Sequence, residues 1–362
     1  MNKDFWHKLP RPLYVLAPMA NVTDSVFRGL FAKYGKPDVT WTEFVSADGL
    51  CSPGRARLLV DLKYSPKERP IVAQLFTGHP EPMKKAAALA RKLGFDGLDI
   101  NMGCPVRLVD KQGGGAALIK EPKAALAVLA AAREGFKGPV SVKTRIGYNK
   151  VDLEWIRLLL NQKLPALTVH LRTRKEMSDC PAHWELMPEI VRMRDEIQAE
   201  LQPAERTLII GNGDVVSLAD GAAKCAETGC DGVMIGRGIF GAPWFFEDVG
   251  KFRKKRGAMS PASLLKSVES FDTFEKSSDR YTPQHSPAER LKILLEHTRL
   301  FEKTYCGKKH LKNFAVMKKH FKAYVSGWDG AKELRAKLME TENYAQVAKI
   351  IKEAHVDNPL VS

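Results

Sequence analysis

The chain has 362 residues, of which 44% are hydrophobic, and its 57 Lys and Arg against 42 Asp and Glu give a formal net charge of +15. This hydrophobic content is ordinary for a chain that buries a core, and it excludes a disordered or fibrous protein. The length predicts two domains, or one large barrel with an appendage.

The charge is concentrated in the last third of the chain. Residues 251–362 contain 23 Lys and Arg but 13 Asp and Glu, a net charge of +10. A basic segment that follows a nearly balanced body indicates a polyanionic partner, although a merely solvated surface is an equal alternative from charge alone.

Targeting and redox signals are sparse. The first residues lack the apolar core of a signal peptide, and no apolar run is long enough to span a bilayer. The six cysteines form no Cys-x-x-Cys pair, and no histidine cluster has metal-ligand spacing, so we expect neither a disulfide scaffold nor a metal site. These features predict a cytoplasmic protein with reduced thiols and no membrane association.

Short apolar runs alternate with helical patterns from residue 14 to residue 238. The expected strands are 14–19, 39–45, 71–77, 97–103, 139–147, 166–172, 207–212 and 232–238, and expected helices between them include 81–93, 122–134, 153–161, 186–199 and 218–228. Eight strand–helix units in roughly 240 residues match a closed (β/α)8 TIM barrel, an α/β fold, over residues 1–250. An open doubly wound sheet would alternate in the same way, but the count of eight favours the barrel.

The pattern changes after the barrel. Residues 251–287 are rich in Ser, Lys and charge, with proline breakers, and predict a linker that holds one short helix. Residues 288–362 predict a small all-helical domain with a basic face, which begins with Ser286 as N-cap and Glu289 closing a capping box. One stripe of its first helix is apolar, whereas Lys292, Arg299 and Lys303 fall on another face.

Each expected strand ends in polar or conformationally special residues. They are Pro18-Met19, Glu43, Gln74, Asn101 with Cys104, Lys143 with Arg145, His170 with Arg172, Asn212-Gly213-Asp214 and Gly236-Arg237. Active sites of such barrels lie at the carboxyl ends of the strands. A barrel that only had to fold would not need polar groups at all eight ends, so these residues predict a site there.

Glycines and one cysteine stand out among these ends. The glycine-rich ends of the seventh and eighth strands suit a phosphate, because glycine lets backbone N–H groups approach closely. Cys104 lies in a loop between Gly103 and Pro105, and its thiol suits proton donation because thiols are mostly protonated at neutral pH. We interpret Cys51, Cys225 and Cys230 as small buried hydrophobic residues, and residues 113–115 as a flexible glycine loop.

Taken together, these motifs resemble the tRNA-dihydrouridine synthases. The resemblance is carried by Leu16-Ala17-Pro18-Met19, Val22-Thr23-Asp24, Thr42-Glu43, Gln74-Leu75, Asn101-Met102-Gly103-Cys104-Pro105, Gly113-Gly114-Gly115-Ala116, Val142-Lys143-Thr144-Arg145, His170-Leu171-Arg172-Thr173-Arg174, Asn212-Gly213-Asp214 and Gly236-Arg237-Gly238. It covers about residues 13–247 and continues in Lys318-Lys319-His320-Phe321 and in residues 328–335. The family combines an FMN-dependent (β/α)8 barrel with a helical RNA-binding domain, so the resemblance implies both.

The resemblance also implies roles for individual residues. Cofactor-binding residues would be Ala17, Pro18, Met19 and Gln74 along the flavin ring, Lys143 at its N1/O2 edge, and His170, Asn212, Gly213, Asp214, Gly236 and Arg237 around the ribityl chain and phosphate. Asn101, Arg172 and Arg174 would bind the extruded base or phosphate of the substrate, and Lys312, Lys319 and Lys322 would bind the tRNA backbone.

The implied reaction reduces the C5=C6 bond of a uridine in tRNA to 5,6-dihydrouridine. NADPH, or NADH, would reduce FMN, hydride would pass to C6, and Cys104 would protonate C5 as general acid. One alternative is an FMN oxidoreductase of a free pyrimidine, similar to dihydroorotate dehydrogenases, which leaves the basic C-terminal segment unexplained. Another is an RNA-binding protein whose barrel has lost catalysis, against which the joint presence of Cys104, Lys143 and His170 argues.

Overall fold

The computed structural model describes residues 5–250, 285–307 and 310–354. Parallel strands form a ring with the order β1-β9-β8-β7-β6-β5-β4-β2, and β3 also pairs with β4. The strands are β1 (Leu13–Leu16), β2 (Thr40–Trp41), β3 (Val45–Ser46), β4 (Ile71–Phe76), β5 (Gly97–Met102), β6 (Val140–Arg145), β7 (Ala166–His170), β8 (Leu208–Asn212) and β9 (Gly232–Ile235). A parallel bridge between Val15 and Val39 joins the two edges, so the predicted (β/α)8 barrel is confirmed.

Where the sequence predicted one second strand over 39–45, the structure has two short pieces, β2 and β3. The chain leaves the strand path between them because the Thr42 hydroxyl donates to the Glu43 carbonyl and accepts from Gln74 N. Several other strands stop two or three residues before their predicted ends. Pro18, Met19, Arg172 and Arg237 therefore lie in the loops that follow the strands.

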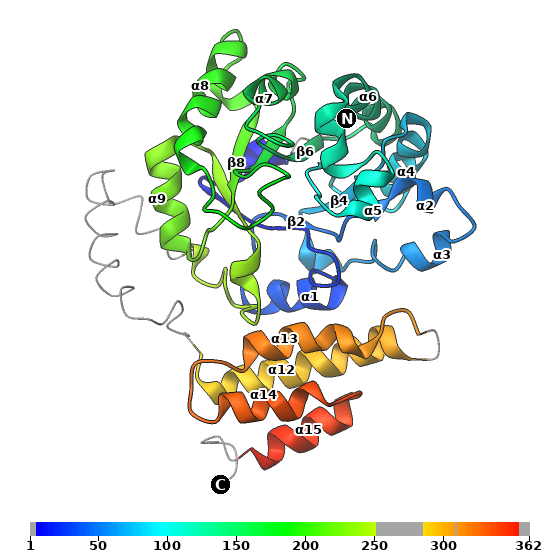
Figure 1. Ribbon diagram of the computed structural model, residues 1–362, viewed down its shortest axis with the longest axis vertical. Coiled ribbons are helices and arrows are strands. Elements are labelled where there is room, and N and C mark those ends of the chain that lie inside the picture. The colour runs from blue at the N-terminus through cyan, green and yellow to red at the C-terminus, as the bar shows by residue number, and fades with distance from the viewer. Residues whose placement is uncertain (1–4, 251–284, 308–309, 355–362) are drawn as a thin grey trace.

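Helices on the outside cover the strands (Figure 1). They are α1 (Ser25–Tyr34), α2 (Ala47–Leu50), α3 (Arg55–Leu58), α4 (Pro80–Lys92), α5 (Arg107–Lys111), α6 (Pro122–Phe136), α7 (Leu153–Leu160), α8 (Met187–Ile197) and α9 (Leu218–Thr228). Short 3-10 turns occupy Trp6–Lys8, Pro66–Glu68, Gly115–Lys120, Trp184–Leu186, Pro203–Glu205 and Arg237–Ile239. Side chains of Asp24, Asp152 and Ser217 cap the free N–H groups that begin α1, α7 and α9, as short polar residues do at helix starts.

The strand register aligns the polar residues at the carboxyl ends. Asn101 on β5 is the partner of Lys143 on β6, and Arg145 is the partner of His170 on β7. His170 is in turn the partner of Asn212 on β8. Residues far apart in the sequence thus meet at one end of the barrel, which is where the sequence predicted the site.

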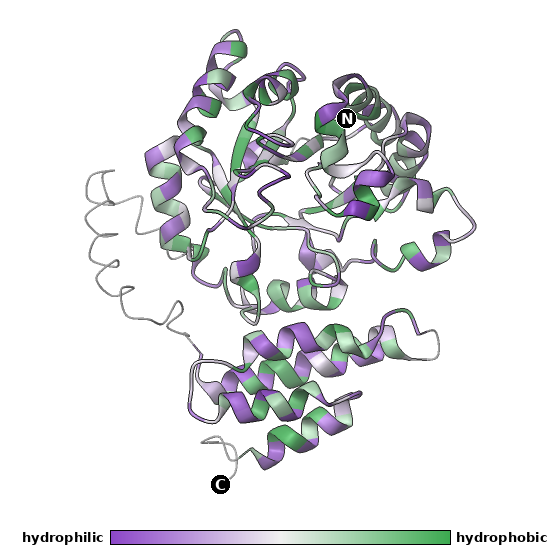
Figure 2. Cartoon of the chain, in the orientation of Figure 1, coloured by the Kyte–Doolittle hydropathy of each residue, from purple (hydrophilic) through white to green (hydrophobic). Residues whose placement is uncertain are grey.

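After the barrel the described chain is helical. It contains α12 (Pro287–Phe301), a π-helical turn (Glu302–Cys306), a 3-10 turn (Phe314–Val316), α13 (Met317–Tyr324), α14 (Ala331–Met339) and α15 (Tyr344–Glu353). The predicted Ser286 cap and Glu289 capping box are present. Hydrophobic and hydrophilic residues alternate along these helices, as amphipathic helices require (Figure 2). Most of the predicted linker, residues 251–284, lies outside the described residues.

The helical domain packs against α1 of the barrel (Figure 1). Phe27 of α1 stacks on His297 of α12 with ring centroids 4.9 Å apart, and it meets His320 of α13 edge-on. The Tyr305 hydroxyl lies 2.7 Å from Ser25 Oγ, and Lys33 forms an ion pair with Glu296 at 2.7 Å. These contacts fix the helices beside the barrel entrance.

Candidate active site

A chain of side-chain hydrogen bonds inside the barrel leads to Cys104. Gln74 Nε2 donates to Asp99 at 2.7 Å, and Gln74 Oε1 accepts from Asn101 Nδ2 at 3.0 Å. Asn101 Oδ1 then accepts from the backbone N–H groups of Gly103 at 3.1 Å and Cys104 at 2.8 Å. Asp99 thereby sets the orientation of both amides, because an ionised carboxylate can only accept. These hydrogen bonds connect the loop that carries Cys104 to the interior of the barrel.

The Arg145 side chain and the backbone at Ala116 also hold this loop. Arg145 Nε donates to the Gly103 carbonyl at 2.9 Å, and Ala116 N donates to the Cys104 carbonyl at 3.0 Å. Gly115 has φ +60°, and a Cβ there would lie 2.8 Å from the Cys104 carbonyl oxygen. The glycine run was predicted to be a flexible loop, but Gly114 and Gly115 are buried and pack closely, so this prediction was wrong for them.

The Cys104 side chain is almost covered, with 8% of its surface exposed. Burial raises the pKa of its thiol, and the nearby cations Lys143 and Arg145 oppose this only in part. The thiol is therefore protonated at neutral pH. Once it had given up its proton, the same cations would stabilise the thiolate.

Lys143 is a half-buried cation without an acidic ion-pair partner among the described residues. Its Nζ donates to Asn212 Oδ1 at 3.1 Å, and burial together with Arg145 lowers its pKa to about 8. Asp99 lies near enough to favour the charged form, although burial raises the pKa of Asp99 itself to about 6. A half-buried ammonium of this kind provides a binding place for an anion.

A second cluster of polar side chains lies at the carboxyl ends of β7, β8 and β9. Asp214 accepts from Arg172 at 2.5 Å and from Arg237 at 3.1 Å. Arg172 Nη1 lies 3.3 Å from His170 Nε2, which must accept this bond since arginine only donates. Burial and the surrounding cations hold the pKa of His170 well below its ordinary range, so the ring is neutral and carries its proton on Nδ1.

The ends of β1 and β9 come together beside this group. A Cβ placed on Gly236 would find only Ala17 Cβ at 3.8 Å and Met19 Sδ at 3.9 Å, which leaves open space over the glycine. Ala17 and Pro18 are buried, while Met19 is half-buried. Small and apolar groups on one side and cations on the other suit a ligand with a flat ring and a phosphate.

Comparison with known proteins identifies the family. The family model described as "Dihydrouridine synthase (Dus)" matches residues 15–358. The chain belongs to the dihydrouridine synthase family. A probable tRNA-dihydrouridine synthase of Staphylococcus aureus is 37% identical over 98% of this chain and 96% of its own. Probable tRNA-dihydrouridine synthase 2 of Bacillus subtilis is 38% identical over 97% and 96%.

Solved structures resemble the barrel more distantly. Morphinone reductase is 13% identical, covers 67% of this chain and 87% of its own, and gives a TM-score of 0.46. The old yellow enzyme homologue from Zymomonas mobilis is 15% identical, covers 66% and 88%, and gives 0.44. Among the described residues, no helix is both long and apolar enough to cross a bilayer.

The structure places the predicted substrate residues of this family member in different surroundings. The amide of Asn101 is engaged with Gln74 and the cysteine loop, and Arg172 is 2% exposed and also donates to the Cys180 carbonyl at 2.6 Å. Arg174 stacks over Tyr148 at 5.3 Å from the ring centroid. Lys319 and Lys322 are exposed on α13, as predicted.

Lys312 was predicted to share the exposed basic face of Lys319 and Lys322, and this placement was wrong. Its side chain is 8% exposed and forms ion pairs with Glu43 and, at 3.0 Å, with Asp61 of the barrel. Lys312 precedes the 3-10 turn and is not part of α13, so its spacing of seven from Lys319 does not place it on that face. The pair of Lys312 and Glu43 instead joins the two domains.

Sequence reasoning missed Asp99 and gave Arg145 no role. A signal for Asp99 was present, because alternate residues of a strand share a face, and Asp99 and Asn101 are two apart on β5. The cysteines were partly misjudged: Cys225 and Cys230 are buried as predicted, but Cys51 is exposed.

The structure also gathers Glu176, Cys180 and His183, whose potential ligand atoms lie within 4.8 Å of one another. His183 lies between Glu176 at 3.1 Å and Glu185 at 2.9 Å, and hydrogen bonds to these carboxylates raise its pKa. Both ring nitrogens of His183 are therefore engaged by carboxylates. The ion pairs therefore account for the cluster.

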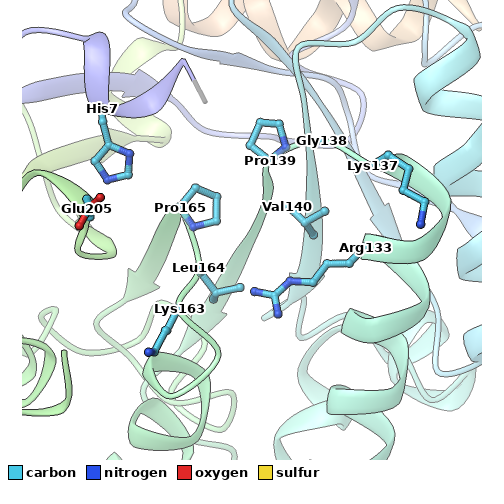
Figure 3. A pocket seen from close by; sticks show the side chains of 10 residues that line it. All are labelled: His7, Arg133, Lys137, Gly138, Pro139, Val140, Lys163, Leu164, Pro165 and Glu205. Carbon is cyan, nitrogen blue, oxygen red and sulfur yellow. The ribbon is translucent and has the colours of Figure 1, made fainter. Parts of the chain in front are cut away.

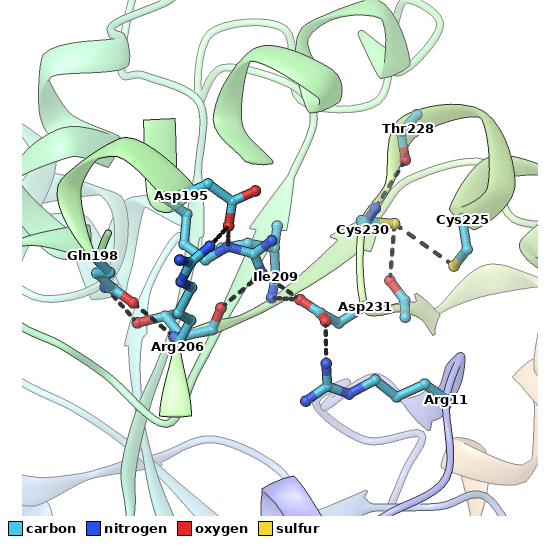
Figure 4. A network of polar contacts seen from close by, with 12 residues as sticks. Arg11, Asp195, Gln198, Arg206, Ile209, Cys225, Thr228, Cys230 and Asp231 are labelled. Carbon is cyan, nitrogen blue, oxygen red and sulfur yellow. Dashed lines mark hydrogen bonds and ion pairs between the residues drawn. The ribbon is translucent and has the colours of Figure 1, made fainter. Parts of the chain in front are cut away.

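The opposite end of the barrel serves stability. A cavity of about 510 Å³ opens there beside the start of β6, and its walls include Arg133, Lys163 and Glu205 (Figure 3). Asp231, just before β9, accepts from Arg11 at 2.8 Å and from Ile209 N at 2.8 Å (Figure 4). This network ties strand starts together on the face of the barrel away from Cys104, where residues of such folds serve stability.

Proposed function

We propose that this protein reduces the C5=C6 bond of a uridine in tRNA to 5,6-dihydrouridine, with FMN as cofactor and NADPH or NADH as reductant. The observation that carries the proposal is the position of Cys104. A buried, protonated thiol is held by Asn101 and Arg145 at the carboxyl end of a family barrel, near the cation of Lys143. A positioned acid beside a cation is what protonation of an enolate requires.

The residues at the barrel mouth fit FMN. Ala17, Pro18, Met19 and Gln74 would line the ring, and the half-buried Lys143 would balance negative charge on it. The phosphate and ribityl chain would meet the cations around Asp214, together with the open backbone at Gly236. The cofactor when bound supplies hydride to C6 of the uracil.

The protein's own residues supply the second half of the addition. Cys104 Sγ would deliver its proton to C5, and Lys143 and Arg145 would stabilise the thiolate that remains. Arg145 contributes doubly, since its guanidinium also fixes the Gly103 carbonyl and hence the loop. Asn101 keeps the Cys104 backbone in place and so determines where the thiol stands.

A uridine inside folded tRNA must leave its stack to reach Cys104, which costs a few kcal/mol. The helical domain beside the barrel entrance would offset this cost by binding the RNA backbone. Lys319 and Lys322 on α13, and Lys292, Arg299 and Lys303 at the other helix surface, present exposed cations for it.

The test uses the purified protein with FMN, NADPH and tRNA that lacks dihydrouridine, followed by nucleoside mass spectrometry. We expect a yellow protein that forms dihydrouridine in tRNA and leaves free uracil and orotate unchanged. Reduction of a free pyrimidine with tRNA untouched would contradict the proposal and favour the small-molecule alternative. A colourless protein that takes up no FMN would refute the cofactor assignment.

A further inference from the structure

Large apolar side chains are exposed mainly at the barrel mouth. Seven such residues occur in the described part of the chain, and five of them lie in the segments that follow β5, β6, β7 and β8. These five are Val106, Leu108, Val151, Met177 and Val216. Scattered exposed apolar residues need no explanation, but a concentration at the end that carries the site indicates a binding surface.

Val106 and Leu108 are the most exposed of the group, at 51% and 67%. They lie on the segment that begins with Cys104 and forms α5. Val109 of the same helix is buried in a cluster with Cys104 and Phe76. The short helix therefore has an anchored side and a side that presents Val106 and Leu108 to solvent.

The base of this projection is fixed. Gly114 N donates to the Val109 carbonyl at 3.2 Å, and the Tyr148 hydroxyl contacts Asp110 at 3.0 Å. Leu108 is four residues from Cys104, so their Cα atoms lie within about 14 Å of each other even for an extended chain. When the base of one nucleotide has reached the thiol, its neighbouring nucleotides lie within this distance.

Exposed cations accompany the apolar side chains. Arg107 and Lys111 are exposed on the same segment, and no ion pair involves them within the described residues. Lys150 and Lys175 are exposed in the loops after β6 and β7. Apolar groups that insert between bases, flanked by cations that bind phosphates, are typical of proteins that unstack nucleic acids.

We propose that Val106 and Leu108 form an apolar wedge that enters the base stack of folded RNA and occupies the place left by the extruded uridine. Arg107 and Lys111 bind the phosphates on either side. The wedge rests on the proposed function, because it acts on the same RNA. The segment that extrudes the base then also carries Cys104, so the extruded uridine is placed next to the thiol.

The test compares Val106→Ser/Leu108→Ser with Leu93→Ser. Leu93 is a matched control because it is exposed to 39% but directly follows α4, next to the strand starts at the far end of the barrel. Each protein is assayed on folded tRNA that lacks dihydrouridine and on a short single-stranded RNA whose uridines need no extrusion. We expect the double variant to lose about tenfold or more in kcat/KM on folded tRNA, because extrusion of a stacked base is costly, and little on the single strand. Leu93→Ser should match the wild type on both.

A second readout does not depend on chemistry. With 2-aminopurine next to the target uridine, binding of wild-type protein should raise the fluorescence as the base unstacks, while the double variant should bind without this rise. Equal losses of kcat/KM on both RNAs, or an unchanged fluorescence rise in the double variant, would overturn the wedge while leaving the function intact. Wild-type protein that neither binds RNA nor forms dihydrouridine would overturn the proposed function and the wedge with it.

Discussion

Replacement of Lys312 by Met removes the charge that joins the helical domain to the barrel and keeps the length of the side chain. Lys312 pairs with Glu43, whose side chain is 5% exposed, and with Asp61, whose side chain is 24% exposed. Asp61 can be hydrated in the variant, but Glu43 is left buried without a counter-charge. Breaking a buried pair in this way is strongly destabilising.

The size of the effect has an upper limit, because Glu43 can take up a proton. Burial already raises its pKa above the ordinary 4.5. Protonation of a group with that ordinary pKa costs about 1.4 kcal/mol for each pH unit above 4.5. The cost is therefore about 3.4 kcal/mol at pH 7 and about 1.4 kcal/mol at pH 5.5. With Lys312 present, burial already raises the pKa of Glu43 to about 7, so the wild type already bears part of this cost. We therefore expect Lys312→Met to lower the free energy of unfolding by about 1 kcal/mol at pH 7, and by less at pH 5.5.

The assay is urea unfolding at both pH values for Lys312→Met, Glu43→Gln and the double variant, with Lys319→Met as the exposed control. The double variant should recover most of the stability that Lys312→Met loses, because no buried charge is then unpaired. Lys312→Met that is as stable as Lys319→Met at both pH values would refute the reasoning. So would a loss that does not change with pH.

Three further predictions address the RNA surface, the hydrogen-bond chain and acid stability. Lys319→Gln/Lys322→Gln should weaken tRNA binding and reduce the slope of log K against log salt by about 0.7 to 0.9 per lost contact, and an unchanged slope would show that this face is only solvated. Asp99→Asn should lower kcat about tenfold with FMN still bound, because Asn can also donate and no longer fixes the Gln74 and Asn101 amides; an unchanged kcat would contradict this. His297 and His320 are buried with pKa values below the ordinary 6.5, so the unfolded chain binds more protons below that pH. In urea unfolding, the contribution of these histidines to the free energy of unfolding should be fully present above pH 6.5 and fall by about 2 kcal/mol per histidine by pH 5. His320→Phe should make this pH dependence less steep.

The sequence was sufficient for the features that depend on local pattern. Alternating apolar runs predicted the strands, Ser286 predicted the start of α12, and the rule for barrels placed the polar residues at one end. The break between β2 and β3 was missed, because there the Thr42 hydroxyl bonds to the Glu43 carbonyl and to Gln74 N of β4, which lies far away in the sequence.

Features set by distant partners could not be predicted from local pattern. Lys312 and Glu43 are 269 positions apart in the sequence, and only the docking of the helical domain brings them together. The orientation of Asn101 depends on Gln74 and Asp99 across two neighbouring strands, so its sequence motif did not reveal that it holds the cysteine loop. Helical spacing locates a face relative to its own helix, but it does not say which residues another domain covers.

The central claim is that this chain reduces uridine in tRNA through Cys104. The most direct measurement maps dihydrouridine across the total RNA of cells that contain the protein and of cells from which its gene is deleted. The account predicts that specific tRNA positions lose dihydrouridine on deletion, regain it with wild-type protein or Cys51→Ala, and do not regain it with Cys104→Ala. Unchanged dihydrouridine at every tRNA position on deletion, or full restoration by Cys104→Ala, would contradict it.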